Sequence, residues 1–183
     1  MADTEGAKRL KQGLVHVYTG DGKGKTTAAL GLALRAVGHG LKAYVVQFLK
    51  GNIDYGELVA AQTFDGRLVI EQRGRETFVD PRNPDPVDVE LARKALARSR
   101  EVLVSGEWDL VVLDEVCVAV AFGMLRPEDV LDVVEARAGH VEVVLTGRRA
   151  HPTFVEAADL VTEMRLVKHY YDRGVEAREG IEF

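Results

Sequence analysis

Glycine, lysine and threonine residues at positions 19–27 form the stretch with the clearest chemistry, Thr-Gly-Asp-Gly-Lys-Gly-Lys-Thr-Thr. It follows a β-branched run and opens an Ala- and Leu-rich segment of helical period, which is the context that a phosphate-binding loop requires. Its three glycines let the backbone turn so that successive N–H groups can point into one concavity that holds anionic oxygens. The N-terminus of the following helix adds unpaired N–H groups and a partial positive charge. We call residues 19–27 the phosphate loop.

Two side chains of the phosphate loop complete this prediction. Lys25 can reach the phosphates as a mobile cation, and the hydroxyl of Thr26 is placed to bind Mg²⁺. The match to the pattern G-x-x-x-x-G-K-[ST] is imperfect, because Thr19 stands where the pattern has its first glycine. Gly20 and Gly22 can supply the missing backbone freedom.

A pair of carboxylates points to the same kind of site. Asp114 and Glu115 directly follow the continuous apolar run 110–113, which is typical of a strand buried on both faces. In a parallel sheet the carboxyl end of a strand faces the ligand crevice, and a carboxylate there can hold Mg²⁺ directly or through water. The two motifs together indicate a site for a magnesium–nucleotide complex.

Residue types and spacing leave four uses of the nucleotide open. An ATPase would use Glu115 to orient water for attack on the γ-phosphate, and a small-molecule kinase would transfer that phosphate to an acceptor. A regulatory switch would only bind and release the nucleotide. In the fourth interpretation the nucleoside part is transferred and the phosphates are the leaving group.

Short β-branched runs alternate with segments of helical period, which predicts a single α/β domain with a mostly parallel sheet flanked by helices. The expected strands are residues 14–18, 43–48, 67–71 (a candidate edge strand), 110–113, 141–145 and 160–164, and the expected helices are 25–37, 87–103 and one that begins at Pro127. Residues 74–88 hold three of the five prolines and predict an irregular loop. The polar residues 1–12 are expected to extend from a domain that spans 13–183.

Charge, hydropathy and cysteine content argue against several classes of protein. The net charge of −5 and the pI near 5.6 argue against a broadly basic surface for nucleic acid. The apolar runs are far shorter than the ~20 residues of a membrane span, so no membrane partner is expected. The single cysteine, Cys117, excludes an intrachain disulfide and a multi-cysteine zinc site and is expected to be a small buried hydrophobic residue. The N-terminus lacks the apolar core of a secretion signal, so we expect a cytoplasmic protein.

Several further blocks occur in one order along the chain, and with the phosphate loop they resemble the P-loop type of corrinoid adenosyltransferase over residues 13–183. Beyond residues 19–29, the blocks are 35–40 (Arg-Ala-Val-Gly-His-Gly), 46–51 (Val-Gln-Phe-Leu-Lys-Gly), 111–115, 136–140, 145–148 (Leu-Thr-Gly-Arg), 158–163, 167–169 and 180–181. The resemblance implies a P-loop fold and transfer of the 5′-deoxyadenosyl group from ATP to the Co(I) centre of a reduced corrinoid, with release of triphosphate. The physiological setting would be adenosylcobalamin biosynthesis or salvage. A generic P-loop ATPase that uses Glu115 to activate water is the alternative.

The resemblance also implies roles for individual residues, with ATP bound in the reversed sense relative to other P-loop proteins. The nucleotide-binding residues would be Gly20, Asp21, Gly22, Lys23, Gly24, Lys25, Thr26, Thr27, Arg35 and Arg148. Lys25, Thr26 and Glu115 would be catalytic, and Thr26, Glu115 and Asp114 would be ligands of Mg²⁺. Co(I) carries no proton to be removed, which favours Glu115 as a metal ligand over a general base. The corrinoid contacts would be Gln47, Lys50, Phe78 and Lys168.

One segment departs from the family pattern. Family members often carry a Phe-Thr-Trp-like segment after the third strand, whose aromatic side chains help to remove the lower axial ligand of cobalt. The corresponding residues 74–78 of this chain contain a single aromatic residue, Phe78, at a shifted position. The partners implied by the resemblance are ATP, a reduced corrinoid, an electron-donating flavoprotein and a second copy of the chain in a homodimer. The N-terminal segment of one copy can cover the nucleotide site of the other in this family.

Overall fold

The computed structural model describes residues 9–51 and 55–183, and in these residues six strands form one sheet. The strands are β1 (Val15–Thr19), β2 (Ala43–Gln47), β3 (Leu68–Gln72), β4 (Leu110–Asp114), β5 (Glu142–Thr146) and β6 (Leu160–Glu163). Their order is β3-β2-β4-β5-β1-β6, and every neighbouring pair is parallel. All carboxyl ends therefore lie at one edge of the sheet, which we call the carboxyl edge.

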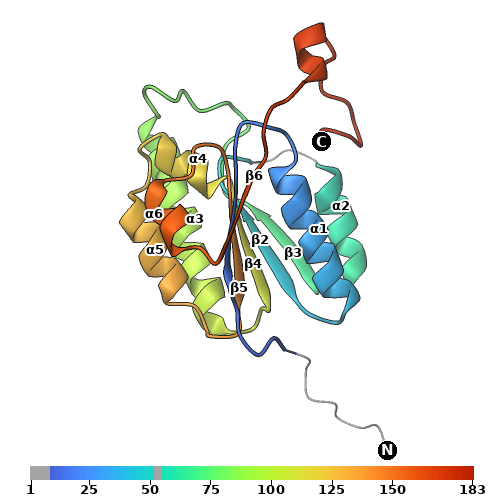
Figure 1. The fold of residues 1–183 in the computed structure, drawn as a ribbon, viewed down its shortest axis with the longest axis vertical. Helices are drawn as coiled ribbons and strands as arrows, with labels where there is room; N and C mark the ends of the chain where they lie inside the picture. The colour runs from blue at the N-terminus through green and yellow to red at the C-terminus, as the bar shows by residue number, and fades with distance from the viewer. Residues whose placement is uncertain (1–8, 52–54) are drawn as a thin grey trace, which may run out of the picture.

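Helices cover both faces of the sheet, as Figure 1 shows. They are α1 (Lys25–Gly38), α2 (Gly56–Ala61), α3 (Pro86–Ser105), α4 (Val116–Ala121), α5 (Pro127–Glu135) and α6 (Pro152–Ala157), with short 3₁₀ turns η1 (Gln62–Phe64) and η2 (Tyr170–Arg173). Helices α1 and α2 pack on one face, and α3 to α6 pack on the other. The domain therefore has three layers, as expected for an α/β protein with right-handed crossovers.

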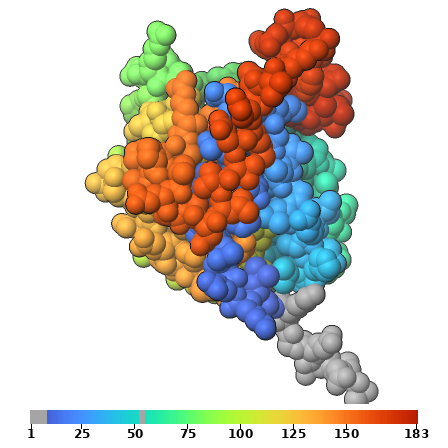
Figure 2. Space-filling model, in the orientation of Figure 1, coloured from blue at the N-terminus to red at the C-terminus, as the bar shows by residue number. Residues whose placement is uncertain are grey.

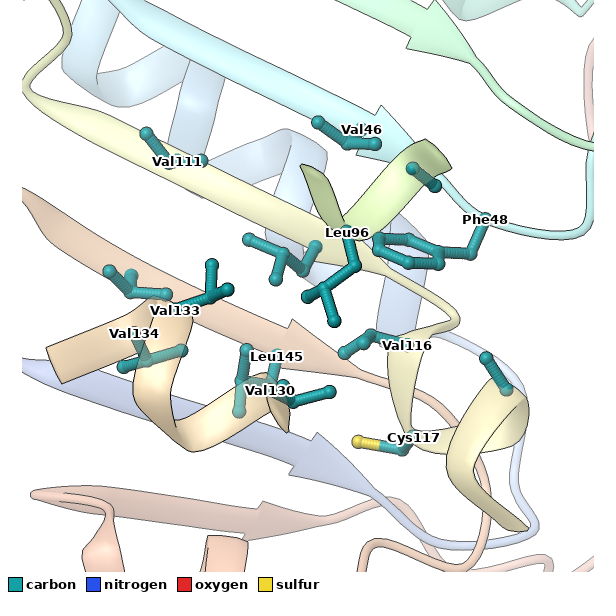
Figure 3. Packing of buried hydrophobic residues seen from close by; sticks show 14 of the residues in the cluster. Val46, Phe48, Leu96, Val111, Val116, Cys117, Val130, Val133, Val134 and Leu145 are labelled. Carbon is teal, nitrogen blue, oxygen red and sulfur yellow. The ribbon is translucent and has the colours of Figure 1, made fainter. Parts of the chain in front are cut away.

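Successive residues of the central strands serve the two faces in turn. Val111 and Leu113 of β4 belong to the core on the α3–α6 side, whereas Val112 packs with α1 on the other side. Alternation of side chains along a strand explains why a strand that is covered on both faces reads as a continuous apolar run. In Figure 3, Val130 and Val133 of α5 lie against the sheet near Leu145, with Leu96 of α3 and Val116 of α4 beside them.

The strands and long helices predicted from the sequence are confirmed to within about two residues at each end, and β3 is an edge strand as expected. Three helices of six residues, α2, α4 and α6, are not predicted, because fewer than two turns give no complete amphipathic period. Residues 74–85 form no helix or strand, in agreement with the predicted irregular loop, and Asp85 caps α3 by accepting a bond of 2.9 Å from the N–H of Val87. Most of the expected N-terminal extension, residues 1–8, lies outside the described residues.

Candidate active site

The sheet order brings three strand ends together at the carboxyl edge. Strand β5 lies between β1 and β4, so the end of β5 separates the phosphate loop from the two carboxylates that follow β4. Thr146, the last residue of β5, joins them: its hydroxyl donates to Asp114 Oδ1 over 2.7 Å and accepts the N–H of Glu115 over 2.9 Å. The hydroxyl of Thr26, from the first turn of α1, donates to the same Asp114 oxygen over 2.8 Å.

Two glycines give the phosphate loop its shape. Gly20 and Gly24 have φ values of 95° and 119°, in the region that favours glycine. A Cβ on Gly20 would lie 2.4 Å from the carbonyl oxygen of Met164, so the loop approaches the chain that leaves β6 more closely than a side chain allows. The N–H of Gly22 donates to this same oxygen over 2.7 Å.

Lys25 is held inside the phosphate loop. Its Nζ donates to the carbonyl oxygens of Gly20 and Gly22, each over 2.7 Å, and the residue is 6% exposed. Burial lowers the pKa of Lys25, against the opposing effect of Glu115. The ammonium is therefore fixed where an anion in the loop would meet it.

Asp114 is fully buried and accepts from three side chains. Oδ1 accepts from the two threonines described above, and Oδ2 accepts from Lys50 Nζ over 3.1 Å. Burial alone would lower the pKa of Lys50, but the charge of Asp114 and the hydrogen bond to it outweigh burial and raise this pKa. A carboxylate with both oxygens satisfied can remain charged away from water.

Glu115 lies at a sharp turn between β4 and α4. Its φ of 65° is in the left-handed region, which costs free energy in a residue with a side chain and is concentrated at functional sites. Burial first, and then the neighbouring charge of Asp114, raises the pKa of Glu115, while Lys50, Lys25 and Arg148 act in the opposite direction. Glu115 therefore lies in the same electrostatic environment as the phosphate-loop lysine.

The oxygen ligands at this point suit Mg²⁺. Thr26, Asp114 and Glu115 offer a hydroxyl and two carboxylates, which are hard donors of the kind that this ion prefers. Among residues 9–51 and 55–183 no group of three or more His, Cys, Asp or Glu forms a site able to hold a metal by itself. Mg²⁺ in nucleotide sites needs no such group, because substrate phosphates and waters complete its coordination.

The remaining nucleotide residues predicted from the sequence occupy different places. Asp21, Lys23 and Thr27 are exposed on the phosphate loop, and Arg148 is exposed after β5, near enough to influence the pKa values of Lys25 and Glu115. Arg35 is not brought to this group. It lies in the last turn of α1, ten residues beyond Lys25 and so about 15 Å farther along the helix axis.

The predicted corrinoid residues also differ in accessibility. Gln47 is completely buried, and its side chain donates to Glu57 over 3.2 Å and accepts from Gln72 over 3.2 Å, so in this structure it supports the strand end and offers no surface to a ligand. Lys50 lies at the site, because its Nζ donates a hydrogen bond to Asp114. Phe78 has a relative exposure of 104%, and Lys168 is also exposed.

Sequence reasoning did not single out Thr146, which is completely buried and binds both Asp114 and the Glu115 backbone. The sequence signal nearest to it is a hydroxyl residue at the end of an apolar run, followed by Gly147. The close approach of Gly51 and Gly74 was also missed: a Cβ on Gly51 would lie 2.0 Å from the Gly74 carbonyl oxygen.

The parallel sheet, the glycine-rich loop that leads into α1 and the acidic end of β4 define the class as a P-loop nucleotide-binding protein. Solved structures with a similar fold include a KaiC-like protein from Pyrococcus horikoshii (TM-score 0.58, 16% identity, 86% of this chain and 75% of that chain) and the flagellar accessory protein FlaH from Methanocaldococcus jannaschii (TM-score 0.58, 12% identity, 85% and 71%). At these identities the likeness concerns the fold alone.

Sequence comparison gives the family. The profile of the ATP:corrinoid adenosyltransferases BtuR/CobO/CobP matches residues 11–183. The chain is 39% identical to a corrinoid adenosyltransferase of Pseudomonas aeruginosa, over 96% of this chain and 86% of that protein, and 39% identical to the corrinoid adenosyltransferase CobA of Salmonella typhimurium, over 94% and 87%. The chain belongs to the ATP:corrinoid adenosyltransferase family, and the generic ATPase alternative finds no support in these relatives. The structure holds no helix, within the described residues, of the length and apolarity that a membrane crossing requires.

Proposed function

We propose that this chain holds the triphosphate of Mg-ATP in its phosphate loop while the 5′ carbon of ATP is transferred to the Co(I) centre of a reduced corrinoid. The electron pair of Co(I) attacks the 5′ carbon and forms the cobalt–carbon bond. The bond between that carbon and the α-phosphate oxygen breaks, and triphosphate leaves with its electron pair. The cobalt becomes formally Co(III), and no proton changes place.

The placement of Lys25 is the observation that carries this proposal. Its ammonium is buried and bonded to the carbonyls of Gly20 and Gly22, beside the oxygens of Thr26 and Asp114. A leaving group with several negative charges is stabilised by donors that are already aimed at it, and each such donor is worth about 2.7–4 kcal/mol of barrier. The backbone N–H groups at the start of α1 add to the same field.

Thr26, Asp114 and Glu115 would hold Mg²⁺, which supplies neutralising charge to the phosphates when it is bound. Glu115 needs no role as a base, because the attacking cobalt carries no proton. Asp114 orients Thr26 and Lys50 through hydrogen bonds of 2.8 and 3.1 Å. These contacts fix the side chains of the site before the substrates arrive.

Further partners of the site are proposed on the family relationship. Lys50, Phe78 and Lys168 would contact the corrinoid, and Arg148 would contact the nucleotide. An electron-donating flavoprotein would supply the electrons for Co(I), and two copies of the chain would associate as a homodimer in the cytoplasm.

Product analysis tests the proposal. The protein is mixed anaerobically with Mg-ATP and chemically reduced cob(I)alamin, and the products are followed by absorbance and by phosphorus NMR. We expect a light-sensitive alkyl–cobalt spectrum together with one intact triphosphate for each corrinoid converted. ADP and orthophosphate without an alkyl–cobalt product would contradict the proposal and favour hydrolysis.

A further inference from the structure

Two parts of the chain project from the carboxyl edge. One is the proline loop, residues 74–85, and the other is the C-terminal segment, residues 165–183, which includes η2. Figure 2 shows them as green and red projections, with the surface hollowed between them. The ribbon in Figure 1 shows that both extend beyond the strand ends at the carboxyl edge, the same edge at which β1 leads into α1.

Hydrogen bonds and an ion pair fasten the C-terminal segment to the phosphate loop at two points. At the start of the segment, the carbonyl oxygen of Met164 accepts the N–H of Gly22 over 2.7 Å. Near the end of the chain, a carboxylate oxygen of Glu182 lies 3.3 Å from Lys23 Nζ. The segment therefore leaves the phosphate loop and returns to it.

The proline loop is fastened to the other side of the site. The N–H of Gly74 donates to the carbonyl oxygen of Lys50 over 2.7 Å, and Lys50 Nζ is bound to Asp114. The next residue, Arg75, reaches across the base of the loop and donates two hydrogen bonds of 2.6 and 2.7 Å to Asp88 in the first turn of α3, which is 4% exposed. Both projections thus border the group that holds the triphosphate in the proposed function.

Both projections expose apolar side chains. Phe78 on the proline loop is fully exposed, and Val167 and Tyr171 on the C-terminal segment have relative exposures of 92% and 71%. Leu166, Ile181 and Phe183 of the same segment are exposed as well. Six exposed apolar side chains on two segments that are both fastened beside the phosphate loop and Lys50 favour a binding surface at this edge of the sheet.

Glu182 holds the C-terminal segment in shape. It accepts from the hydroxyl of Tyr170 and from the backbone N–H and Nε of Arg178, the last two over 2.8 and 3.2 Å. The guanidinium of Arg178 also lies over the ring of Tyr170 at 5.0 Å. The hydrogen bonds from Arg178 and Tyr170 lower the pKa of Glu182 to about 2, so the carboxylate is charged at neutral pH.

We infer that the C-terminal segment is a wall of the corrinoid site, opposite the proline loop, and that Glu182 is the positioning residue that keeps this wall in place. The inference rests on the proposed function. The acceptor must reach bonding distance of the 5′ carbon while the triphosphate occupies the phosphate loop, so it lies over the loop and between the two projections. A corrin ring has broad apolar faces and a rim of amides and carboxylates, which suits exposed apolar side chains accompanied by the cations Lys168 and Arg173.

Tyr171 tests the wall directly. Cob(II)alamin is titrated into the wild-type protein and three variants in the presence of Mg-ATP, and binding is followed by absorbance. The variants are Tyr171→Ala, Tyr171→Phe and the control Val104→Ala. Val104 is 52% exposed and lies at the end of α3, away from the carboxyl edge. We expect Tyr171→Ala to raise the corrinoid Kd about tenfold, with Tyr171→Phe and Val104→Ala near wild type and the Kd for ATP little changed. The side chain is largely exposed, so its removal leaves the fold intact.

Glu182 tests the positioning role, with Glu179 as the matched control on the same segment. Glu182→Ala is expected to speed hydrogen exchange of amides in residues 165–183 and to raise the corrinoid KM about tenfold with little change in the KM for ATP. Glu182→Gln, which keeps an acceptor oxygen, should restore part of the loss. Glu179→Ala should leave both KM values and the exchange pattern unchanged.

Three outcomes would overturn the inference. The first is an unchanged corrinoid Kd in Tyr171→Ala. The second is an equal loss of ATP and corrinoid binding in Glu182→Ala. The third is a shift in oligomeric state of Tyr171→Ala with normal corrinoid affinity, which would assign the apolar surface to a second copy of the chain. A wild-type protein that binds cob(II)alamin but releases ADP would instead contradict the proposed function, so the two failures are distinguishable.

Discussion

Two regions lie at the carboxyl edge: the phosphate loop with its neighbouring carboxylates, and the two projections. Each departs from the usual distribution of side chains between interior and surface, but in a different way. Around the phosphate loop, charged groups are buried: Lys25 is 6% exposed and Asp114 is fully buried. On the two projections, apolar groups are exposed, with Phe78 and Val167 almost entirely in solvent. Soluble proteins normally bury apolar side chains and expose charged ones, so both departures call for a ligand.

The two regions differ in how firmly their side chains are held before a ligand binds. The buried charges are each bound to several partners, so the nucleotide end of the site is fixed before substrate arrives, which suits the stabilisation of a leaving group. The proline loop is held at its base and by Val79, which packs against the core, and the C-terminal segment is held by its contacts with the phosphate loop and by Glu182. Phe78, Val167 and Tyr171 nevertheless remain largely exposed. In the proposed function, the buried and bonded half would hold the triphosphate, and the exposed apolar half would be covered by the second substrate.

Removal of the phosphate-loop ammonium should have the largest effect. We expect Lys25→Ala to lower the rate of adenosyl transfer by about 10²–10³-fold, because a preorganised donor to the leaving triphosphate is lost. Single-turnover rates measure the effect, and thermal unfolding monitors the fold. Lys94→Ala, on the exposed face of α3, is the control and should leave the rate unchanged. A Lys25→Ala variant as fast as the wild type would remove the loop from the mechanism.

A change at Asp114 should affect stability most. Asp114→Asn keeps one oxygen for the two threonines but replaces the oxygen that faces Lys50 with an amide NH₂, so the buried charge and the acceptor of the Lys50 ammonium are both lost. We expect a loss of about 3 kcal/mol in the free energy of unfolding. Thermal unfolding should show a midpoint lower by about 6–12 °C. The control is Asp129→Asn, which removes a surface ion pair with Arg126, and its midpoint should stay close to that of the wild type. An unchanged midpoint for Asp114→Asn would mean that the buried half is not held by this network.

A smaller effect is expected at Glu115. Glu115→Gln should raise the Mg²⁺ concentration needed for half-maximal transfer, because an amide is a weaker ligand for a hard cation than a carboxylate. A magnesium titration at saturating ATP measures the shift. A variant that binds ATP with normal Mg²⁺ affinity and cannot hydrolyse it would assign Glu115 to water activation instead.

The smallest effect concerns the only cysteine. Burial raises the pKa of Cys117 to about 12, so the thiol is neutral and shielded at pH 7–8. We expect iodoacetamide to leave the folded protein unmodified and active, and to label it only in denaturant, as mass spectrometry can show. Rapid labelling of the folded protein would mean that the core beneath α4 opens readily.

Local sequence signals place the phosphate loop and the acidic pair at strand ends, where the structure also has them. The phosphate loop and the Asp114–Glu115 pair are contiguous in sequence, and each adjoins a strand whose apolar run fixes where it ends. Their meeting point then follows from the parallel sheet alone. Thr146 could not be recognised in the same way, because its role depends on β5 lying between β1 and β4, and strand order is not written in local sequence.

The apolar half was harder to predict. The prolines indicated an irregular loop over residues 74–88, and the structure ends it at residue 85, where α3 begins with Pro86. Neither the anchor from Arg75 to Asp88 nor the exposure of Phe78 follows from composition. Glu182 was overlooked because its contact with the phosphate loop, through Lys23, joins residues that lie far apart in sequence. The placement of Gln47 illustrates the same limit: a polar residue at a strand end can face a ligand or, as here, support its neighbours in the interior.

The most direct test of the central claim is a crystal structure with Mg-ATP and cob(II)alamin bound. We expect triphosphate oxygens within hydrogen-bonding distance of the phosphate-loop amides and Lys25, with the 5′ carbon of ATP turned toward the corrinoid. A phosphate loop that is empty in this complex, or that holds the adenosine end of the nucleotide, would contradict it.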